Sequence, residues 1–235
     1  MIEKSLNNKK KVAIFDIDGT IFRSSLLIEI TKALINKGIF SKDTGKVYEK
    51  AYENWFNRQD SYEKYIMAVV KAFESNIKGV NHEDFIKIAE NVVDISKNQI
   101  YKYTRELVKE LKKKKYFLLA ISYSPKETVE TFCKHLGFDK VYGRVYEVDK
   151  NKIMTGKTLY LDLISDKSKI LNHAVLKENL TLKNSIGVGD SESDIKFLQM
   201  VDNPICFNPN QKLFNKAKEA GWKIVVERKD VIYII

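Results

Sequence analysis

The sequence contains little cysteine, histidine or proline: of its 235 residues, two are cysteine, three are histidine and three are proline. Cys133 and Cys206 lie in apolar segments, without metal-ligand spacing, so we expect two buried thiols. Three prolines leave little room for a linker. The chain is therefore expected to form one large domain, or one core domain with an inserted module.

Long hydrophobic runs are also missing. The longest apolar runs, 116–121 and 231–235, have the length of a strand and fall far short of the roughly 20 residues that a spanning helix needs. The segment 1–11 is polar and basic, with no apolar stretch typical of a signal peptide. The sequence therefore predicts a protein without a membrane span, located in the cytoplasm.

Positive charge is abundant, with a formal net charge of +10. The lysines are spread along the chain, and only 9–11 and 112–115 form runs. This spread favours a solvated surface over a nucleic-acid site, so we expect no nucleic-acid partner. A positive field would help to attract an anionic phosphate ester. We expect a small-molecule substrate and a monomer or homodimer.

The order of apolar patterns predicts an α/β fold. A buried parallel strand is expected at 11–18, followed by a helical block at 24–98 that Gly38, Gly45 and Gly79 punctuate. Helices and strands then alternate, which predicts a doubly wound parallel sheet, with a small β-hairpin and ligands at the carboxyl ends of the strands. The predicted helices are 101–114, 125–136, 167–176, 192–200 and 211–220, and the predicted strands are 116–122, 141–147, 154–160, 185–188, 204–207 and 222–226. The core would comprise 1–22 and 99–235, and an all-helical cap would comprise 23–98.

The first candidate site is the motif Asp16-Ile17-Asp18-Gly19-Thr20 at the end of the first strand. Carboxylates at i and i+2 point to the same side and repel each other unless a cation or a proton intervenes, and Mg²⁺ prefers such oxygen ligands. One carboxylate can accept a phosphoryl group while the other protonates the leaving oxygen. An acidic turn after a strand is the structural alternative.

The second candidate site is the segment 120–125, where a strand is expected to lead into a helix. The pattern Ser124-Pro125-Lys126-Glu127 predicts a capping box, so Ser124 is assigned to the cap and not to the site. The Ser122 hydroxyl and the backbone N–H of Tyr123 would then lie where a helix N-terminus binds phosphate.

The third and fourth candidate sites follow later in the chain. Lys167 would lie in the first turn of a helix, against the helix dipole, where a bound dianion would offset the cost; Lys169 is the competing candidate. Asp190 follows a strand, and Asp194 lies one helical turn later, so both can face one point. Asp194 also has the spacing of a capping residue for its helix.

Together these motifs resemble the haloacid dehalogenase superfamily, in its phosphoserine-phosphatase-like branch with a helical cap after the first strand. The resemblance covers nearly the whole chain. It implies that Asp16 is the nucleophile and a Mg²⁺ ligand, and that Asp18 is the acid/base and a Mg²⁺ ligand through its backbone carbonyl. The resemblance also implies metal binding by Asp190, a place for Asp194 either on the metal or behind its ligands, and phosphate binding with catalytic assistance by Ser122 and Lys167. We further expect Gly19, Thr20 and Tyr123 to contact the phosphate.

The same resemblance bears on the substrate. Dehalogenases of the superfamily generally lack the second aspartate of the first motif, so Asp18 favours phosphoryl chemistry. Phosphoserine phosphatases have in common a glutamate nine residues after the nucleophile. This chain has Ser25 at that position, and Glu29 is out of register with it. We therefore expect another small phosphomonoester. Arg23 could bind a substrate carboxylate, or could be a solvated linker residue.

The sequence leaves two further hypotheses open. A phosphotransferase or phosphomutase would keep every catalytic residue and pass the phosphoryl group to an acceptor other than water. A basic binding protein could retain the fold without turnover.

Overall fold

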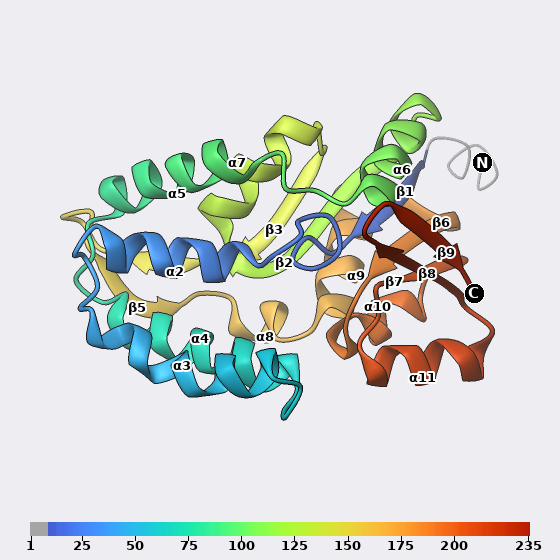
Figure 1. Ribbon diagram of the computed structural model, residues 1–235. Coiled ribbons are helices and arrows are strands. Elements are labelled where there is room, and N and C mark those ends of the chain that lie inside the picture. The colour runs from blue at the N-terminus through green and yellow to red at the C-terminus, as the bar shows by residue number, and fades with distance from the viewer. Residues whose placement is uncertain (1–8) are drawn as a thin grey trace.

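The computed structural model describes residues 9–235 and contains a sheet-based part and a helical part (Figure 1). Residues 1–8, which belong to the predicted core segment 1–22 and to the polar segment 1–11, lie outside the described residues. Within 9–235, no helix combines the length and the apolar character that crossing a membrane requires.

The main sheet has seven strands in the order β3-β2-β1-β6-β7-β8-β9. All neighbours pair in parallel except β8 and β9, which are antiparallel. This order confirms the doubly wound parallel sheet. The strands are β1 (Lys10–Phe15), β2 (Phe117–Pro125), β3 (Lys140–Arg144), β6 (Leu180–Gly189), β7 (Asn203–Phe207), β8 (Lys223–Arg228) and β9 (Val231–Ile234).

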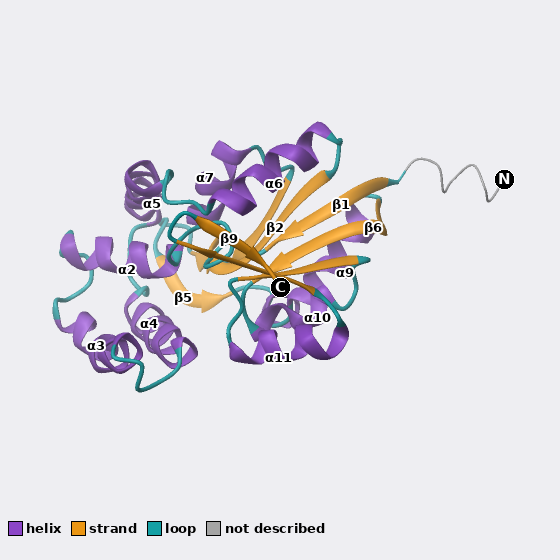
Figure 2. Cartoon of the chain, turned by 45° about the vertical axis from the view of Figure 1, so that its right-hand side comes forward, coloured by secondary structure: helices purple, strands orange, loops and turns teal. Residues whose placement is uncertain are grey.

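Helices cover both faces of this sheet (Figure 2). Successive side chains of β1 point to opposite faces, so Ala13 and Phe15 pack in one apolar cluster while Val12 and Ile14 pack in another. The first cluster includes side chains of α6 and α7, and the second includes side chains of α9, α10 and α11. These helices are α6 (Lys102–Lys113), α7 (Lys126–Leu136), α9 (Lys167–Lys177), α10 (Ile195–Leu198) and α11 (Gln211–Ala220).

The helical block predicted at 24–98 forms four helices, α2 (Leu26–Asn36), α3 (Asp43–Phe56), α4 (Tyr62–Asn76) and α5 (His82–Ser96). Asn81 caps α5, as its sequence pattern predicts, by accepting hydrogen bonds from the first N–H groups of the helix. Gly38 and Gly79 follow α2 and α4 with positive φ. The prediction that Gly45 also punctuates the block is wrong, because Gly45 lies inside α3.

A two-stranded hairpin, β4 (Tyr146–Val148) and β5 (Met154–Thr158), joins the helical part. Tyr146 and Met154 are buried in the apolar cluster of α2, α4 and α5, and the N–H of Gly79 donates to the Met154 carbonyl at 2.9 Å. The expected single strand 141–147 is therefore two strands, since β3 belongs to the main sheet. The division into a core (1–22, 99–235) and a cap (23–98) stays a prediction.

Other local predictions need correction. The predicted helix 192–200 begins as the 3₁₀ turn η1 (Glu192–Asp194) before α10, and a short helix, α8 (Leu161–Ile164), was not predicted. The predicted strand 116–122 continues to Pro125, because its last residue still pairs with Arg144 of β3. Ser122 therefore precedes the N-terminus of α7 by several residues, and the expected position at that terminus is wrong.

Candidate active site

The predicted site residues meet at the carboxyl edge of β2, β1 and β6, which are neighbours in the sheet. Asp16 directly follows β1, Asp190 directly follows β6, and Ser122 lies near the end of β2. Lys167 is the first residue of α9. Side chains from distant parts of the chain thus converge on one edge, which is where open parallel sheets bind ligands.

Asp16 lies at the centre of the site and is only 4% exposed. Its Oδ1 accepts a hydrogen bond from the Lys167 amine at 2.6 Å, and its Oδ2 accepts one from the Thr20 hydroxyl at 3.1 Å. Burial raises the pKa of Asp16 to about 7, against the lowering effect of Lys167 and with added repulsion from Asp194 and Asp18. The carboxylate is thus oriented by two donors while its charge is only partly compensated.

Lys167 is a buried cation, 2% exposed, that joins two carboxylates. Its Nζ lies 2.6 Å from Asp16 Oδ1 and 2.6 Å from Asp194 Oδ1, and 5.1 Å from the centre of the Tyr123 ring. Burial lowers the pKa of the amine, but the two carboxylates raise it more, so Lys167 stays charged. Lys169 is exposed, and its amine donates to the Asp162 carbonyl at 3.1 Å. Of the two candidate lysines, Lys167 is the one that contacts Asp16.

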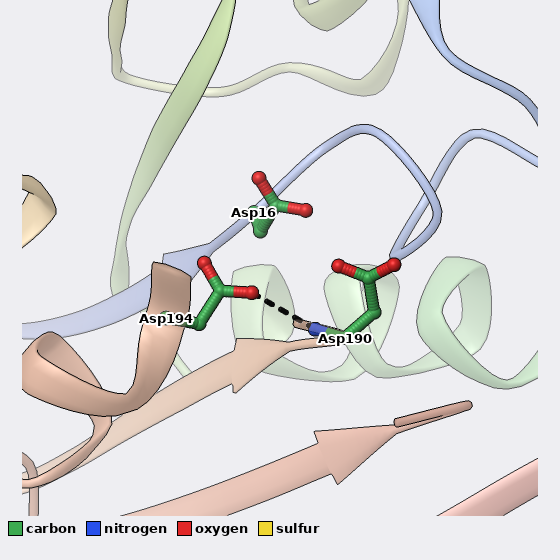
Figure 3. Close-up of side chains that lie close together, drawn as sticks. All are labelled: Asp16, Asp190 and Asp194. Atoms are coloured by element: carbon green, nitrogen blue, oxygen red, sulfur yellow. Dashed lines mark hydrogen bonds between the residues drawn. The ribbon is translucent and has the colours of Figure 1, made fainter. Parts of the chain in front are cut away.

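Asp194 is fully buried and ties the loop after β6 to Lys167, whose amine lies 2.6 Å from Asp194 Oδ1. Figure 3 shows its hydrogen bond to Asp190 in that loop. Its Oδ2 accepts hydrogen bonds from the backbone N–H groups of Asp190 and Ser191, each at 3.0 Å. Ser191 and Asp194 also form a capping box, as their spacing predicts. Gly189 permits this arrangement, because a Cβ at that position would collide with the Asp194 side chain. Both oxygens of Asp194 therefore already accept hydrogen bonds.

Asp190 has a carboxylate that faces other carboxylates, as Figure 3 shows. Ligand oxygens of Asp16, Asp190 and Asp194 lie within 4.8 Å of one another. No side-chain or backbone donor among residues 9–235 hydrogen-bonds the Asp190 carboxylate, and burial, followed by the charges of Asp16 and Asp194, raises its pKa well above its ordinary value. Such an unpartnered carboxylate beside a second one suits a hard divalent cation, so the donor set fits Mg²⁺.

Gly19 and Thr20 occupy supporting positions in the loop after β1. Gly19 has a φ of +80°, and a side chain there would collide with the Asp190 carboxylate. The Gly19 N–H donates to the carbonyls of Phe22 and Ser24 at 3.0 and 3.1 Å, and Thr20 is fully buried. These contacts shape the loop around Asp16 and Asp190; phosphate binding by Gly19 and Thr20 stays a prediction.

Asp18 is held by two serines of β2. Its Oδ2 accepts hydrogen bonds from the Ser122 hydroxyl at 2.5 Å and the Ser124 hydroxyl at 2.9 Å, and its Oδ1 accepts one from the N–H of Leu26 at 2.5 Å. The Ser122 hydroxyl also accepts the N–H of Ser124 at 2.9 Å. Ser122 is therefore engaged with Asp18 in this state, and Tyr123, between the two serines, lies beside the Lys167 amine.

Ser124 is the site residue that sequence reasoning missed. The expected capping box is wrong: the residue that precedes α7 is Pro125, which makes no side-chain capping hydrogen bond. Because β2 stays extended through Pro125, the side chains at positions 122 and 124 lie on the same face of the strand. The i, i+2 repetition of serine was the available signal.

Residues of the helical part also approach the site. Tyr62, at the start of α4, is partly exposed, and desolvation followed by the nearby charges of Asp18 and Asp190 raises the pKa of its phenol. Arg23 is exposed, and its guanidinium lies 5.7 Å from the centre of the Tyr101 ring. A substrate contact of Arg23 stays a prediction.

Comparisons with known proteins agree with this arrangement. The family model for haloacid dehalogenase-like hydrolases matches residues 13–199. The chain is 26% identical to the phosphoserine phosphatase SerB1 of Mycobacterium tuberculosis, over 90% of this chain and 69% of that protein. It is 25% identical to a histidinol-phosphatase of Neisseria meningitidis, over 92% of this chain and 98% of that protein. A solved phospho-aspartyl intermediate analogue of phosphoserine phosphatase superimposes with a TM-score of 0.63 at 22% identity, covering 95% of this chain and 96% of that one.

Proposed function

Because the chain belongs to the haloacid dehalogenase-like hydrolases, we propose that it is a Mg²⁺-dependent phosphatase that hydrolyses a small phosphomonoester through an aspartyl-phosphate on Asp16. One observation carries the proposal: the buried Asp16 carboxylate lies between the Lys167 cation, at 2.6 Å, and the carboxylate of Asp190, which has no hydrogen-bond donor among residues 9–235. A nucleophile, a cation for the phosphate and a carboxylate that can hold Mg²⁺ are thereby assembled at one point.

The proposed reaction has two steps. In the first, an Asp16 carboxylate oxygen forms a bond to phosphorus, the P–O bond to the leaving alcohol breaks, and the alcohol oxygen takes a proton from Asp18. In the second, a water oxygen forms a bond to phosphorus and gives a proton to Asp18, while the acyl-phosphate P–O bond breaks and releases Asp16. Asp18 thus serves as acid and then as base.

Asp16 and Asp190 would hold Mg²⁺, together with the backbone carbonyl of Asp18. Bound Mg²⁺ would neutralise the negative charge shared by the carboxylates and the phosphate, which lets one approach the other. Because both oxygens of Asp194 already accept hydrogen bonds, we assign Asp194 chiefly to holding Lys167 and the loop at 190–191.

The phosphate itself would contact Lys167 and the serine-tyrosine pair at 122–123. Lys167 already lies beside Asp16, so an incoming phosphate would meet the amine without a large movement of either side chain. The charge of Lys167 does not depend on pH in the neutral range, because its pKa is raised. These residues would therefore act by position and charge, which supply most of the acceleration in phosphoryl transfer.

The named relatives act on phosphoserine and histidinol phosphate, both small phosphomonoesters. Phosphoserine phosphatases have a glutamate in common at the position that Ser25 occupies in this chain. The Ser25 side chain is buried, with 2% of the residue exposed. The neighbouring Ser24 hydroxyl donates to Glu29 at 2.9 Å. We propose that the substrate is a small phosphomonoester whose recognition differs from that of phosphoserine at position 25.

The test is phosphate release from a panel of phosphomonoesters with and without Mg²⁺. The panel would contain phosphoserine, histidinol phosphate, glycerol phosphate and a chromogenic aryl phosphate. Asp16→Asn should abolish release, while the matched control Asp230→Asn, at the exposed turn between β8 and β9, should leave it unchanged. Phosphate release that persists in Asp16→Asn would show that Asp16 is not the nucleophile. Release at the same rate without Mg²⁺ would show that the reaction does not need the metal.

A further inference from the structure

The N-terminus of α2, the first helix after the catalytic loop, is capped from outside the helix. The first N–H groups of a helix have no acceptor inside it. Ser25 precedes α2 without a side-chain capping bond. Instead, the N–H of Leu26 donates to Asp18 Oδ1 at 2.5 Å, and the N–H of Leu27 donates to Ser124 Oγ at 3.0 Å. Two core residues thus take the place of a local cap.

The Ser124 hydroxyl connects this helix to Asp18. It accepts from the N–H of Leu27 and donates to Asp18 Oδ2 at 2.9 Å, and the residue is 3% exposed. Removing the hydroxyl would leave the Leu27 N–H without its acceptor and would take one of the two serine contacts from Oδ2. The first turn of α2 and the Asp18 carboxylate would therefore both lose a restraint at the same time.

We propose that Ser124 is a positioning residue for the proton transfer between Asp18 and the leaving alcohol oxygen, which rests on the proposed phosphatase function. Ser124 holds Oδ2 on one side while Leu26 holds Oδ1 on the other, so the carboxyl group is fixed in its plane. A backbone N–H can only donate, whereas a serine hydroxyl can donate or accept. Both partners of Asp18 Oδ2 are hydroxyl groups, which can also accept a hydrogen bond. Oδ2 is therefore the Asp18 oxygen that can carry the proton without losing its partners.

This role makes a specific chemical demand. When the P–O bond to the alcohol breaks, an alkoxide leaving group needs the proton from Asp18, whereas an aryl oxide with a delocalised charge leaves without it. A misplaced acid therefore lowers kcat/KM, which covers the steps up to departure of the alcohol, mainly for the first kind of substrate. The second step, in which Asp18 acts as base, is common to both kinds and does not enter kcat/KM. A general loss of structure or of phosphate binding slows both kinds.

The experiment compares Ser124→Ala with the wild-type protein on glycerol phosphate and on a chromogenic aryl phosphate. We expect kcat/KM on glycerol phosphate to fall about 10- to 100-fold and kcat/KM on the aryl phosphate to fall less than about 3-fold. Asp18→Asn should show the same preference for the aryl substrate, and Ser124→Thr, which keeps the hydroxyl, should restore the wild-type ratio. Ser96→Ala removes another buried hydroxyl, bonded to the Val92 carbonyl in α5, and should leave the ratio unchanged.

The ratio of the two rates is independent of how much Ser124→Ala protein folds, because both rates use the same enzyme sample. Equal losses on both substrates, or no loss on either, would overturn the positioning role. Turnover that persists in Asp16→Asn would instead contradict the proposed function. If Asp16→Asn is inactive but Ser124→Ala keeps the wild-type ratio, the positioning role of Ser124 is wrong and the proposed phosphatase function is still supported.

Discussion

The amine of Lys167 lies 2.6 Å from Asp16 Oδ1, although 151 positions separate the two residues in the chain. Both groups are almost fully buried, so the pair is stable only as long as each charge keeps its partner. The contact makes Lys167 both a part of the fold and a part of the proposed phosphate site.

Replacing Lys167 should therefore damage stability and activity together. In Lys167→Met, Asp16 and Asp194 lose their shared cation, and we expect the free energy of unfolding without Mg²⁺ to fall by about 3 kcal/mol. Phosphatase activity should be lost. The measurement is urea unfolding followed by an activity assay.

Lys169→Met is the matched control, because Lys169 is exposed two positions away in the same helix. It should change the free energy of unfolding by no more than about 0.5 kcal/mol and leave activity intact. An inactive Lys169→Met beside an active Lys167→Met would show that the phosphate-binding lysine is misassigned.

Neutralising Asp190 should stabilise the metal-free protein. Asp190 faces Asp16 without a donor of its own among the described residues, so Asp190→Asn removes repulsion, and we expect a gain of about 1 kcal/mol in the free energy of unfolding. The same change should abolish the rise in melting temperature that Mg²⁺ causes. Thermal unfolding with and without Mg²⁺ measures both effects. A variant that is less stable without metal, or that Mg²⁺ still stabilises, would speak against the site.

The pH dependence of stability follows from Asp16. Its pKa is raised from 3.8 to about 7 in the folded protein, mainly by burial. The folded state therefore binds a proton that the unfolded state has lost, and the stability that this proton contributes is lost as the pH rises from about 4 to 7. We expect the metal-free protein to lose at most about 1.4 kcal/mol per pH unit through this group.

Mg²⁺ would take the place of that proton, so it should raise the melting temperature more at pH 8 than at pH 5. Differential scanning calorimetry at the two pH values, with and without Mg²⁺, provides the measurement. In Asp16→Asn the slope against pH should flatten. An equal Mg²⁺ effect at both pH values would contradict the proposed competition between metal and proton.

An ion-pair bridge between the helical part and the sheet-based part should influence substrate binding. Lys212 of α11 lies 2.9 Å from Glu63 of α4 and 2.8 Å from Glu192, beside the site. Exposed ion pairs contribute about 0.2–1 kcal/mol, so Lys212→Met should raise KM by roughly 1.5- to 5-fold and leave kcat nearly unchanged.

The control is Lys216→Met, because Lys216 lies one turn later in α11 and, among residues 9–235, forms an ion pair only within its helix, with Glu219. Added salt should raise the KM of the wild-type protein and of Lys216→Met, but not that of Lys212→Met. If Lys212→Met and wild type respond to salt alike, the bridge does not hold the helical part over the site.

Local signals made much of the fold predictable. The helix predicted at 211–220 is observed at those residues, because Asn210 caps its start by accepting the Leu213 N–H and Gly221 ends it with a φ of +65°. The expected buried thiols are confirmed as well, since Cys133 and Cys206 are buried and free. In both cases the deciding interactions lie within a few residues or follow from side-chain polarity.

Other features depended on contacts between distant segments. The Ser-Pro-Lys-Glu pattern at 124–127 predicted a helix cap, but pairing of Pro125 with Arg144 keeps the strand extended. Strand β9 was visible only as an apolar run, and its place at the edge of the sheet follows from antiparallel pairing with β8. Backbone pairing over long distances overrides such local preferences, because each added residue of the ladder gains a hydrogen bond.

By itself, the sequence determined which side chains stand at the ends of the strands, because alternation of strands and helices leaves polar residues at those ends. It thereby predicted Asp16, Asp18 and Asp190 as neighbours, with Lys167 and Lys169 as competing candidates at the start of a helix. The tertiary structure alone decided that Ser124 contacts Asp18 and that Lys167, not Lys169, contacts Asp16. Hydrogen bonds and ion pairs act over a few ångströms, so they depend on strand register and helix rotation that no local pattern encodes.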